Sequence, residues 1–370
     1  MAAAPSKKEA ICSYILQQIA LGNLRAGDKL PSEKQLCGQF GVSRITAQNA
    51  LNLLESRGDI YRVRGSGSFV GRSAAPPASI LPLIMNSLAP EGRHMEIIEG
   101  ASDYLAGVDC HAAVYPIYQD AEKERKTFES LLEKGNRAFL ILPSHQKESR
   151  DLYFDLIRSG IHLVFLDALP EGLAGNLVSC DNTTGGCLLT EHLIRGGCRR
   201  IAALAPNGLS TVAQRLQGYR YALARHGLAD CPDYRLCLNG GFPFSLGVRE
   251  AVERLLALPE RPDALFCLND QLALAVFACL QERGVRIPAD MALAGFDNLP
   301  ATRDCPVPVT TVEQPFAAMG YEGARLCRAL LDDAQPGRFQ SILLPVRLIA
   351  RRSTARDGGA RSASQPSAVQ

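Results

Sequence analysis

DKLPSEKQLCGQFGVSRITAQNALNLLESRGDIYRVRGSGSFV, residues 28–70, is the stretch that decides how the first part of the chain folds. Ser32 followed by Gln35 forms a capping box, which predicts the start of a helix. Gly41 permits a sharp turn, and Ser43 can cap a further helix directly after it. Two short apolar runs then flank a Gly-Ser-Gly tip. We therefore predict a winged helix-turn-helix, with two helices joined by a tight turn and followed by a strand hairpin.

A first helix is expected upstream, where Ile11, Ile15 and Ile19 recur at helical spacing. In the helix after Ser43, the apolar residues Ala47, Ala50, Leu51 and Leu54 share one face. The polar side chains near the start of that helix point away from this face: Arg44, Thr46, Gln48 and Asn49. A helix fits the major groove of B-DNA, where Gln or Asn pairs with adenine and Arg with guanine. The pattern therefore predicts a recognition helix.

Charge is divided unevenly along the chain. Residues 1–72 hold ten Lys and Arg against five Asp and Glu, a net charge of +5. Residues 73–350 hold 26 Lys and Arg against 32 Asp and Glu, a net charge of −6. The small overall charge of +2 therefore hides a basic N-terminal part and an acidic central part. A basic module of this kind is typical of a domain that contacts the phosphate backbone of DNA.

The same region resembles the N-terminal domain of the GntR family of bacterial transcription regulators, over about residues 7–71. The resemblance is carried by Leu30-Pro31-Ser32-Glu33-Lys34, Val42-Ser43-Arg44 and Gly65-Ser66-Gly67-Ser68-Phe69-Val70. It implies binding to double-stranded operator DNA. With the outward-facing side chains of the recognition helix, it gives these candidate DNA contacts: Lys34, Ser43, Arg44, Thr46, Gln48, Asn49, Arg64 and Gly65. The family more often has Arg at the positions of Lys34 and Gln48, which implies fewer contacts to guanine.

Length and composition set the domain boundaries that we predict. A chain of 370 residues with 46% hydrophobic residues holds two or three domains with sizeable cores. The winged domain is expected over residues 1–71. Residues 72–79, RSAAPPAS, predict an extended linker. A large domain is expected over residues 80–351, and the apolar-poor residues 352–370 are expected to form a disordered tail.

Several classes of protein are disfavoured by what the sequence lacks. No apolar stretch is long enough for a signal peptide or a membrane span, which predicts a cytoplasmic protein without a membrane partner. The twelve cysteines and six histidines are scattered without ligand-like spacing, so no metal and no cofactor are expected. No phosphate loop, nucleophile elbow or catalytic dyad is found, which argues against an enzyme.

From residue 80 onward, short apolar runs alternate with amphipathic helical stretches, which predicts an α/β fold with parallel sheets covered on both faces. The candidate strands are 80–85, 112–118, 138–143, 162–167, 200–205, 264–268 and 292–296. Ligands bind beyond the carboxyl ends of such strands. Polar residues at those ends are Asn86, Tyr118, Asp120, His145, Asp167, Asn269, Asp270 and Asp297. Short carboxylates and amides of this kind suit a polyhydroxylated ligand.

The large domain resembles the LacI/galactose-repressor family and, through it, the type I periplasmic sugar-binding proteins, over about residues 80–352. The resemblance is carried by VSCDNTTGGCLLTEHLIRGGCRRIAAL at 178–204, RLQGY at 215–219, LFCLNDQLAL at 265–274, AGFDN at 294–298 and TTVEQPFAAMG at 310–320. It implies two subdomains joined by three crossovers, with a small polar effector in the cleft between them. The implied hydrogen-bonding residues are Arg215, Asn269, Asp297 and Gln314, and the implied rings are Phe242 and Phe316.

His145 and Asn86 follow strands of the first subdomain and complete the candidate effector contacts. Ordinary structural roles remain open for several of these residues. The structural alternatives are that Arg215 only pairs with a carboxylate, that Asn269 caps the helix that begins at 270, and that Phe316 packs in the core. Asp181 and Asn182 look more like helix-capping and interdomain residues than ligand contacts.

Together the two resemblances predict a ligand-responsive, sequence-specific transcription regulator. It is expected to repress carbohydrate-utilisation genes, with a sugar-like effector that changes its affinity for operator DNA. A homodimer is implied by the family and by the symmetry of operators. The alternatives are a sugar-binding receptor without gene control, which leaves residues 7–71 without a purpose, and an enzyme.

Overall fold

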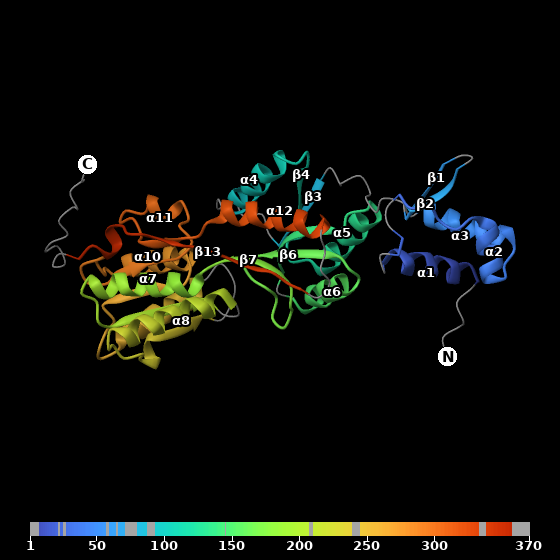
Figure 1. The fold of residues 1–370 in the computed structure, drawn as a ribbon. Helices are drawn as coiled ribbons and strands as arrows, with labels where there is room; N and C mark the ends of the chain where they lie inside the picture. Colours follow the sequence, from blue (N-terminus) through green and yellow to red (C-terminus); the bar gives the residue numbers. More distant parts are fainter. Residues whose placement is uncertain are drawn as a thin grey trace, which may run out of the picture. The chain divides into compact units, whose positions relative to one another are not determined.

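The structure is a computed structural model that describes residues 7–20, 23–24, 27–56, 59–63, 66–70, 80–86, 93–144, 146–206, 210–238, 245–332 and 338–356. The chain divides into two compact units, residues 1–79 and residues 80–370. Each unit is described by itself below (Figure 1). No helix within the described ranges is long and apolar enough to cross a membrane.

Within its described residues, the first unit has three helices and a two-stranded antiparallel sheet: α1 (Lys7–Ala20), α2 (Glu33–Phe40), α3 (Arg44–Ser56), β1 (Ile60–Val63) and β2 (Gly67–Val70). The Ser32–Gln35 capping box that opens α2 is present, and Gly41 adopts the left-handed conformation at φ 58°. The predicted apolar face of α3 is buried and forms the core with Ile11 and Ile15. The order of elements is that of the predicted winged helix-turn-helix.

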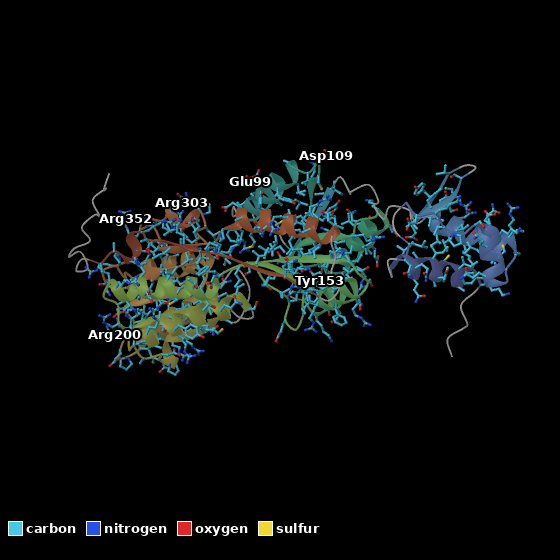
Figure 2. All side chains as sticks on the ribbon, in the orientation of Figure 1. Glu99, Asp109, Tyr153, Arg200, Arg303 and Arg352 are labelled. Atoms are coloured by element: carbon cyan, nitrogen blue, oxygen red, sulfur yellow. The ribbon has the colours of Figure 1, made fainter. Side chains whose placement is uncertain are left out.

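The second unit begins with a six-stranded parallel sheet in the order β13-β7-β6-β5-β3-β4. Its strands are β3 (Ile80–Met85), β4 (His111–Pro116), β5 (Ala138–Leu142), β6 (His162–Leu166), β7 (Asn176–Cys180) and β13 (Ser341–Leu344). Helices α4 (Arg93–Ala106) and α12 (Phe316–Asp332) pack on one face of this sheet. Helices α5 (Ala121–Glu133) and α6 (Lys147–Arg158) pack on the other face, where Tyr153 of α6 lies (Figure 2). The buried Tyr153 hydroxyl donates to Glu124.

A second parallel sheet has the order β11-β10-β8-β9. Its strands are β8 (Ile201–Pro206), β9 (Arg235–Leu238), β10 (Ala264–Cys267) and β11 (Ala292–Ala294). Helices α7 (Asn182–Arg195) and α8 (Ser210–Arg225) cover one face, and α9 (Ser245–Ala257) and α10 (Asp270–Glu282) cover the other. The remaining short elements are the 3-10 helices η1 (Pro232–Tyr234) and η2 (Arg352–Thr354), helix α11 (Ala301–Asp304), and the antiparallel pair of β12 (Thr311–Glu313) and β14 (Arg347–Ile349).

The second unit consists of two halves, each built around one of its two parallel sheets. Within the described residues, the chain passes between these halves three times, as the resemblance to the LacI/galactose-repressor family implies. It leaves the first half from β7 to α7, returns from β12 to α12, and leaves again from β13 to β14. One hydrophobic cluster contains buried residues from both halves. The two halves therefore share a core.

Glycines let the helix pair on each sheet approach closely. A Cβ built on Gly218 of α8 would lie 2.0 Å from the Thr183 carbonyl oxygen of α7, and one built on Gly186 would lie 2.1 Å from the Arg215 carbonyl oxygen. The pair of α4 and α12 is similar, because a Cβ built on Gly100 would lie 1.8 Å from the Ala317 carbonyl oxygen. Any larger side chain at these positions would push a helix backbone away.

All seven predicted strands are present, each within two residues of its expected ends. The chain beyond residue 351 departs from the prediction. Residues 352–354 form η2, and Ser353 and Thr354 are buried, with Ser353 Oγ donating to the Leu293 carbonyl oxygen. These small polar residues are ordered because their hydroxyl groups satisfy backbone groups of the second half. The expected start of the tail at residue 352 was therefore wrong, while residues 357–370 lie outside the described residues.

Candidate functional site

A cavity with a volume of about 240 Å³ lies in the second unit, where strands of both sheets end. Its size is slightly below the range of roughly 300–1,000 Å³ that is usual for drug-sized ligands, so it suits a smaller one. Six of the residues predicted to contact an effector line this cavity: Asn86, Arg215, Asn269, Asp297, Gln314 and Phe316. The structure thus brings together residues that are far apart in the sequence.

Arg215, on α8, is the most extensively bonded side chain of the cavity and is only 4% exposed. Its Nε donates to Asn182 Oδ1 at 2.8 Å, and its Nη1 donates to the Leu268 carbonyl oxygen at 2.6 Å. The same Nη1 lies 3.3 Å from Asp297 Oδ1, and the guanidinium stacks 3.9 Å from the ring centroid of Phe296. Arg215 therefore pairs with a carboxylate, which was the structural alternative, and also lines the cavity.

Asp297 follows β11 and joins Arg215 to Gln314, whose Nε2 donates to Asp297 Oδ1 at 2.6 Å. Its φ of 125° is rarely adopted by residues other than glycine, so the surrounding structure fixes the direction of its carboxylate. Burial raises the pKa of Asp297, and the charges of Arg215 and Arg93 and the hydrogen bond from Gln314 oppose this effect. Because Arg215 and Gln314 donate to its Oδ1 directly, we assign the ionised form to Asp297.

The other predicted residues of the cavity have structural partners as well. Asn269 Oδ1 accepts from the Leu272 N–H at 2.8 Å and so caps α10. Asn86 Nδ2 donates to the Pro143 carbonyl oxygen at 2.8 Å, and Phe316 is 5% exposed within the core. Asn269 therefore caps a helix and Phe316 packs in the core, as the structural alternatives had it. Both side chains also line the cavity. Their contact with an effector stays a prediction.

The cavity also contains polar residues that were not among the predicted contacts. Asp167 was noted at a strand end, and Gln119 and Thr211 also line the wall. Asp167 Oδ1 is buried and has no hydrogen-bond partner among the described residues. Arg93 begins α4, and its Nε is likewise buried and without a partner in that part of the chain. A search of strand ends misses Arg93 because it begins a helix.

Asp270 lies behind the cavity and is completely buried. Its carboxylate accepts from the Leu299 N–H at 2.8 Å and from Thr311 Oγ1 at 2.7 Å. Burial and then the negative charge of Asp297 raise the pKa of Asp270 to about 7. Its hydrogen-bond donors are neutral, so they compensate an ionised carboxylate less than the donors of Asp297 do. Asp270 is therefore the protonated member of the two carboxyl groups at slightly acid pH.

The free energy of unfolding is expected to fall as pH rises from about 4 to about 7. The folded chain holds a proton on Asp270 in this range and the unfolded chain releases it, so stability decreases with increasing pH. Asp270→Asn should remove this contribution. We would measure urea denaturation at pH 4.5 and 7.5 for the parent, for this variant and for Asp304→Asn as an exposed control. If the parent and Asp270→Asn lost the same free energy of unfolding between pH 4.5 and 7.5, the assignment of a proton to Asp270 would be contradicted.

Most of the candidate DNA contacts lie on the surface of the first unit. Lys34, Arg44, Gln48 and Asn49 are exposed, and Thr46 is half-buried. Arg44 is 83% exposed and its Nε lies 3.0 Å from Glu33 Oε2, a pairing that solvent weakens. Ser43 Oγ accepts from the Thr46 N–H at 3.2 Å, which confirms that Ser43 caps α3.

A concave surface connects α2, α3 and the strand hairpin of this unit. Lys34, Arg44 and Arg62 line it together with Gly67 and Ser68 of β2. The hairpin is supported by stacking of Tyr61 on Phe69, with ring centroids 5.5 Å apart. Four predicted site residues lie outside the described residues: Arg64, Gly65, His145 and Phe242.

Comparison with known proteins agrees with both halves of this arrangement. Residues 7–70 match the model of the gntR family of bacterial regulatory proteins, and residues 190–354 match the periplasmic binding protein-like domain. The arabinose metabolism transcriptional repressor of Geobacillus stearothermophilus is 27% identical over 92% of this chain and 95% of its own length. The transcriptional repressor PurR of Vibrio cholerae is 30% identical over 71% of this chain and 76% of its own.

Among solved structures, a LacI family transcriptional regulator from Enterococcus faecium with bound ribose superimposes with a TM-score of 0.61 at 25% identity. The match covers 75% of this chain and 98% of that structure. These relatives are transcription regulators, which disfavours the enzyme and receptor alternatives.

Proposed function

Because the chain belongs to the bacterial transcription regulators that join a GntR-type DNA-binding domain to a LacI-type effector domain, we propose that it represses carbohydrate-utilisation genes in response to a small carbohydrate-type effector. The main support for this proposal is the arrangement of donors and acceptors in the cavity wall. This wall presents fixed donors on Arg215 and Gln314 and a fixed acceptor on Asp297, together with a buried Asp167 oxygen that has no partner among the described residues. Hydroxyl groups both donate and accept, so a polyol satisfies such a wall.

The proposed response uses the three chain passages of the second unit. Arg215, Asn269 and Asp297 come from the second half, whereas Asn86 and Asp167 come from the first. An effector that contacts both halves favours one arrangement of the halves over another, and it shifts the equilibrium only by its difference in affinity for the two. In a homodimer in the cytoplasm, this shift changes how two DNA-binding units fit adjacent half-sites.

The effector and the operator must influence each other equally at equilibrium. If the effector lowers the affinity for operator, operator must lower the affinity for effector by the same factor. The experiment that tests the proposed function is a thermal-shift screen against neutral sugars, sugar acids and sugar phosphates, followed by titration of the protein onto DNA selected from a random duplex library. A compound that raises the melting temperature must also change the affinity for that DNA. Absence of any hit would overturn the carbohydrate assignment.

Gln48→Ala is expected to weaken binding to the selected operator by about 5- to 150-fold, because a bidentate contact to a base contributes about 1–3 kcal/mol. Binding to scrambled DNA should change little, since Gln48 is expected to read a base rather than a phosphate. Fluorescence anisotropy with both duplexes measures the two affinities. Gln39→Ala, an exposed change at the end of α2, is the matched control. Equal losses on operator and scrambled DNA would remove Gln48 from the base-reading surface.

A further inference from the structure

Arg93 is a cation in the cavity wall that forms no ion pair within the described residues. It lines the cavity from the first residue of α4, and its Nε is buried without a hydrogen-bond partner among the described residues. The acidic residue in the first turn of α4, Glu96, is exposed, and no ion pair joins it to Arg93 in that part of the chain. A buried guanidinium N–H without an acceptor is unfavourable. A ligand that brings an acceptor to this N–H would remove that cost.

The position of Arg93 on its helix makes the need for an anion stronger. The N-terminus of a helix carries a partial positive charge, so a cation there is less favourable than it would be at the C-terminus. The partial positive charge at this end of α4 and the guanidinium of Arg93 both favour a negative group near Arg93. A planar guanidinium matches a carboxylate best, because two parallel N–H groups meet its two oxygens.

The second cation of the cavity does not compete for this group. Arg215 already donates to Asn182 and to the Leu268 carbonyl oxygen, and it is paired with Asp297. Its charge is therefore compensated within the protein. Arg93 contributes to the electrostatic environment of Asp297 and lowers the pKa of that carboxyl, but no direct ion pair joins the two among the described residues.

The other side of the cavity limits the charge that a ligand can carry. Asp167 presents a buried Oδ1 without a partner among the described residues, which calls for a hydrogen-bond donor such as a hydroxyl group. Asp297 adds a second carboxylate to the wall. A ligand with two negative charges, such as a phosphate monoester, would face both carboxylates with a single uncompensated cation. One negative charge at one end and hydroxyl groups at the other fit the wall best.

We infer that the effector is a sugar acid and that Arg93 binds its carboxylate. This inference rests on the proposed function and narrows it from carbohydrate-type effectors to those that carry one carboxylate. Arg93 acts as the residue that selects the acid over the neutral sugar. Arg215, Asp297 and Gln314 hold the hydroxyl groups of either.

The test is calorimetric titration of the full-length protein with matched pairs: glucuronate and glucose, galacturonate and galactose, and arabinonate and arabinose. Glucose 6-phosphate is added as a dianion. The proteins are the parent, Arg93→Gln, Arg93→Lys and the control Arg325→Gln, which removes a partly exposed Arg of α12 that pairs with Glu322. We expect the parent to bind at least one acid about tenfold or more tightly than its neutral partner. Arg93→Gln should lose this preference, Arg93→Lys should keep part of it, and the control should keep all of it.

Each other outcome overturns a defined part of the inference. A parent that prefers neutral sugars refutes the sugar-acid effector and leaves the proposed function intact. Tighter binding of glucose 6-phosphate than of any sugar acid refutes the inference that the effector carries a single negative charge. An acid preference that survives Arg93→Gln in a folded protein refutes the role of Arg93. If Arg93→Gln does not fold, the comparison of the parent with Arg93→Lys still tests whether Arg93 sets the preference for the acid. No binding of any compound by the folded parent refutes this inference and the carbohydrate proposal together.

Discussion

Arg215→Ala should abolish the response of DNA binding to the effector and lower the free energy of unfolding of the second unit by about 3–5 kcal/mol. The change leaves the carboxylate of Asp297 buried without its cation, and it removes the donors to Asn182 and to the Leu268 carbonyl oxygen. DNA binding itself should persist, because the candidate DNA contacts belong to the first unit. Anisotropy with selected operator, with and without effector, measures the response, and urea denaturation measures stability.

The control and the rescue variant separate the charge effect from a loss of bulk. Arg220→Ala removes a half-exposed Arg of the same helix that pairs with Asp230, and it should change stability by less than about 1 kcal/mol. Adding Asp297→Asn to Arg215→Ala removes the uncompensated charge and should restore part of the lost stability. An effector response that survives Arg215→Ala would place the effector site elsewhere in the protein.

Gly218→Ala should lower the free energy of unfolding of the second unit by about 3 kcal/mol, at the upper end of the usual cost of overpacking. The new Cβ would lie 2.0 Å from the Thr183 carbonyl oxygen and 2.7 Å from the Cys187 nitrogen, so two helix backbones must separate. Effector affinity should fall as well, because α8 carries Arg215 and α7 begins with its acceptor Asn182. Urea denaturation and calorimetric titration measure the two effects.

Gly107→Ala provides the matched control for this substitution. A Cβ at Gly107 has its nearest neighbour, the Tyr104 carbonyl oxygen, at 3.5 Å, which is ordinary van der Waals contact. Its stability should therefore remain within about 0.5 kcal/mol of the parent. If Gly218→Ala were as stable as Gly107→Ala, the close approach of α7 and α8 would not be a constraint on the fold.

The sequence predicts the elements whose side chains repeat with a clear period. The apolar face of α3 and the seven apolar strands are of this kind, and each is observed. The strands that sequence patterns miss are short or contain polar residues. β7 includes Asn176 and Ser179, which are buried only because Asn176 donates to the Leu163 carbonyl oxygen and Ser179 to the Asp167 carbonyl oxygen. Hydrogen bonds between distant segments cannot be read from local periodicity.

The residues of the cavity also divide into those that sequence patterns locate and those that they miss. Asn86, Asn269 and Asp297 directly follow apolar strands, so the rule that ligands bind at carboxyl ends locates them. Arg215 and Gln314 lie on a helix and after a short strand, and their identification needed the resemblance to a known family. Arg93 has neither signal, because the packing of α4 against α12 and the first sheet brings the first turn of α4 to the cavity.

The return of the chain to its first sheet has a consequence for biosynthesis. α12 and β13 complete the first half, yet they are encoded after the whole of β8 to β11. At bacterial rates of translation, the ribosome needs on the order of ten seconds to proceed from β7 to α12. During that interval the nascent first sheet lacks its edge strand, and the apolar surface that α12 later covers is open to chaperones. Truncation upstream of α12 therefore leaves the earlier-made half incomplete as well.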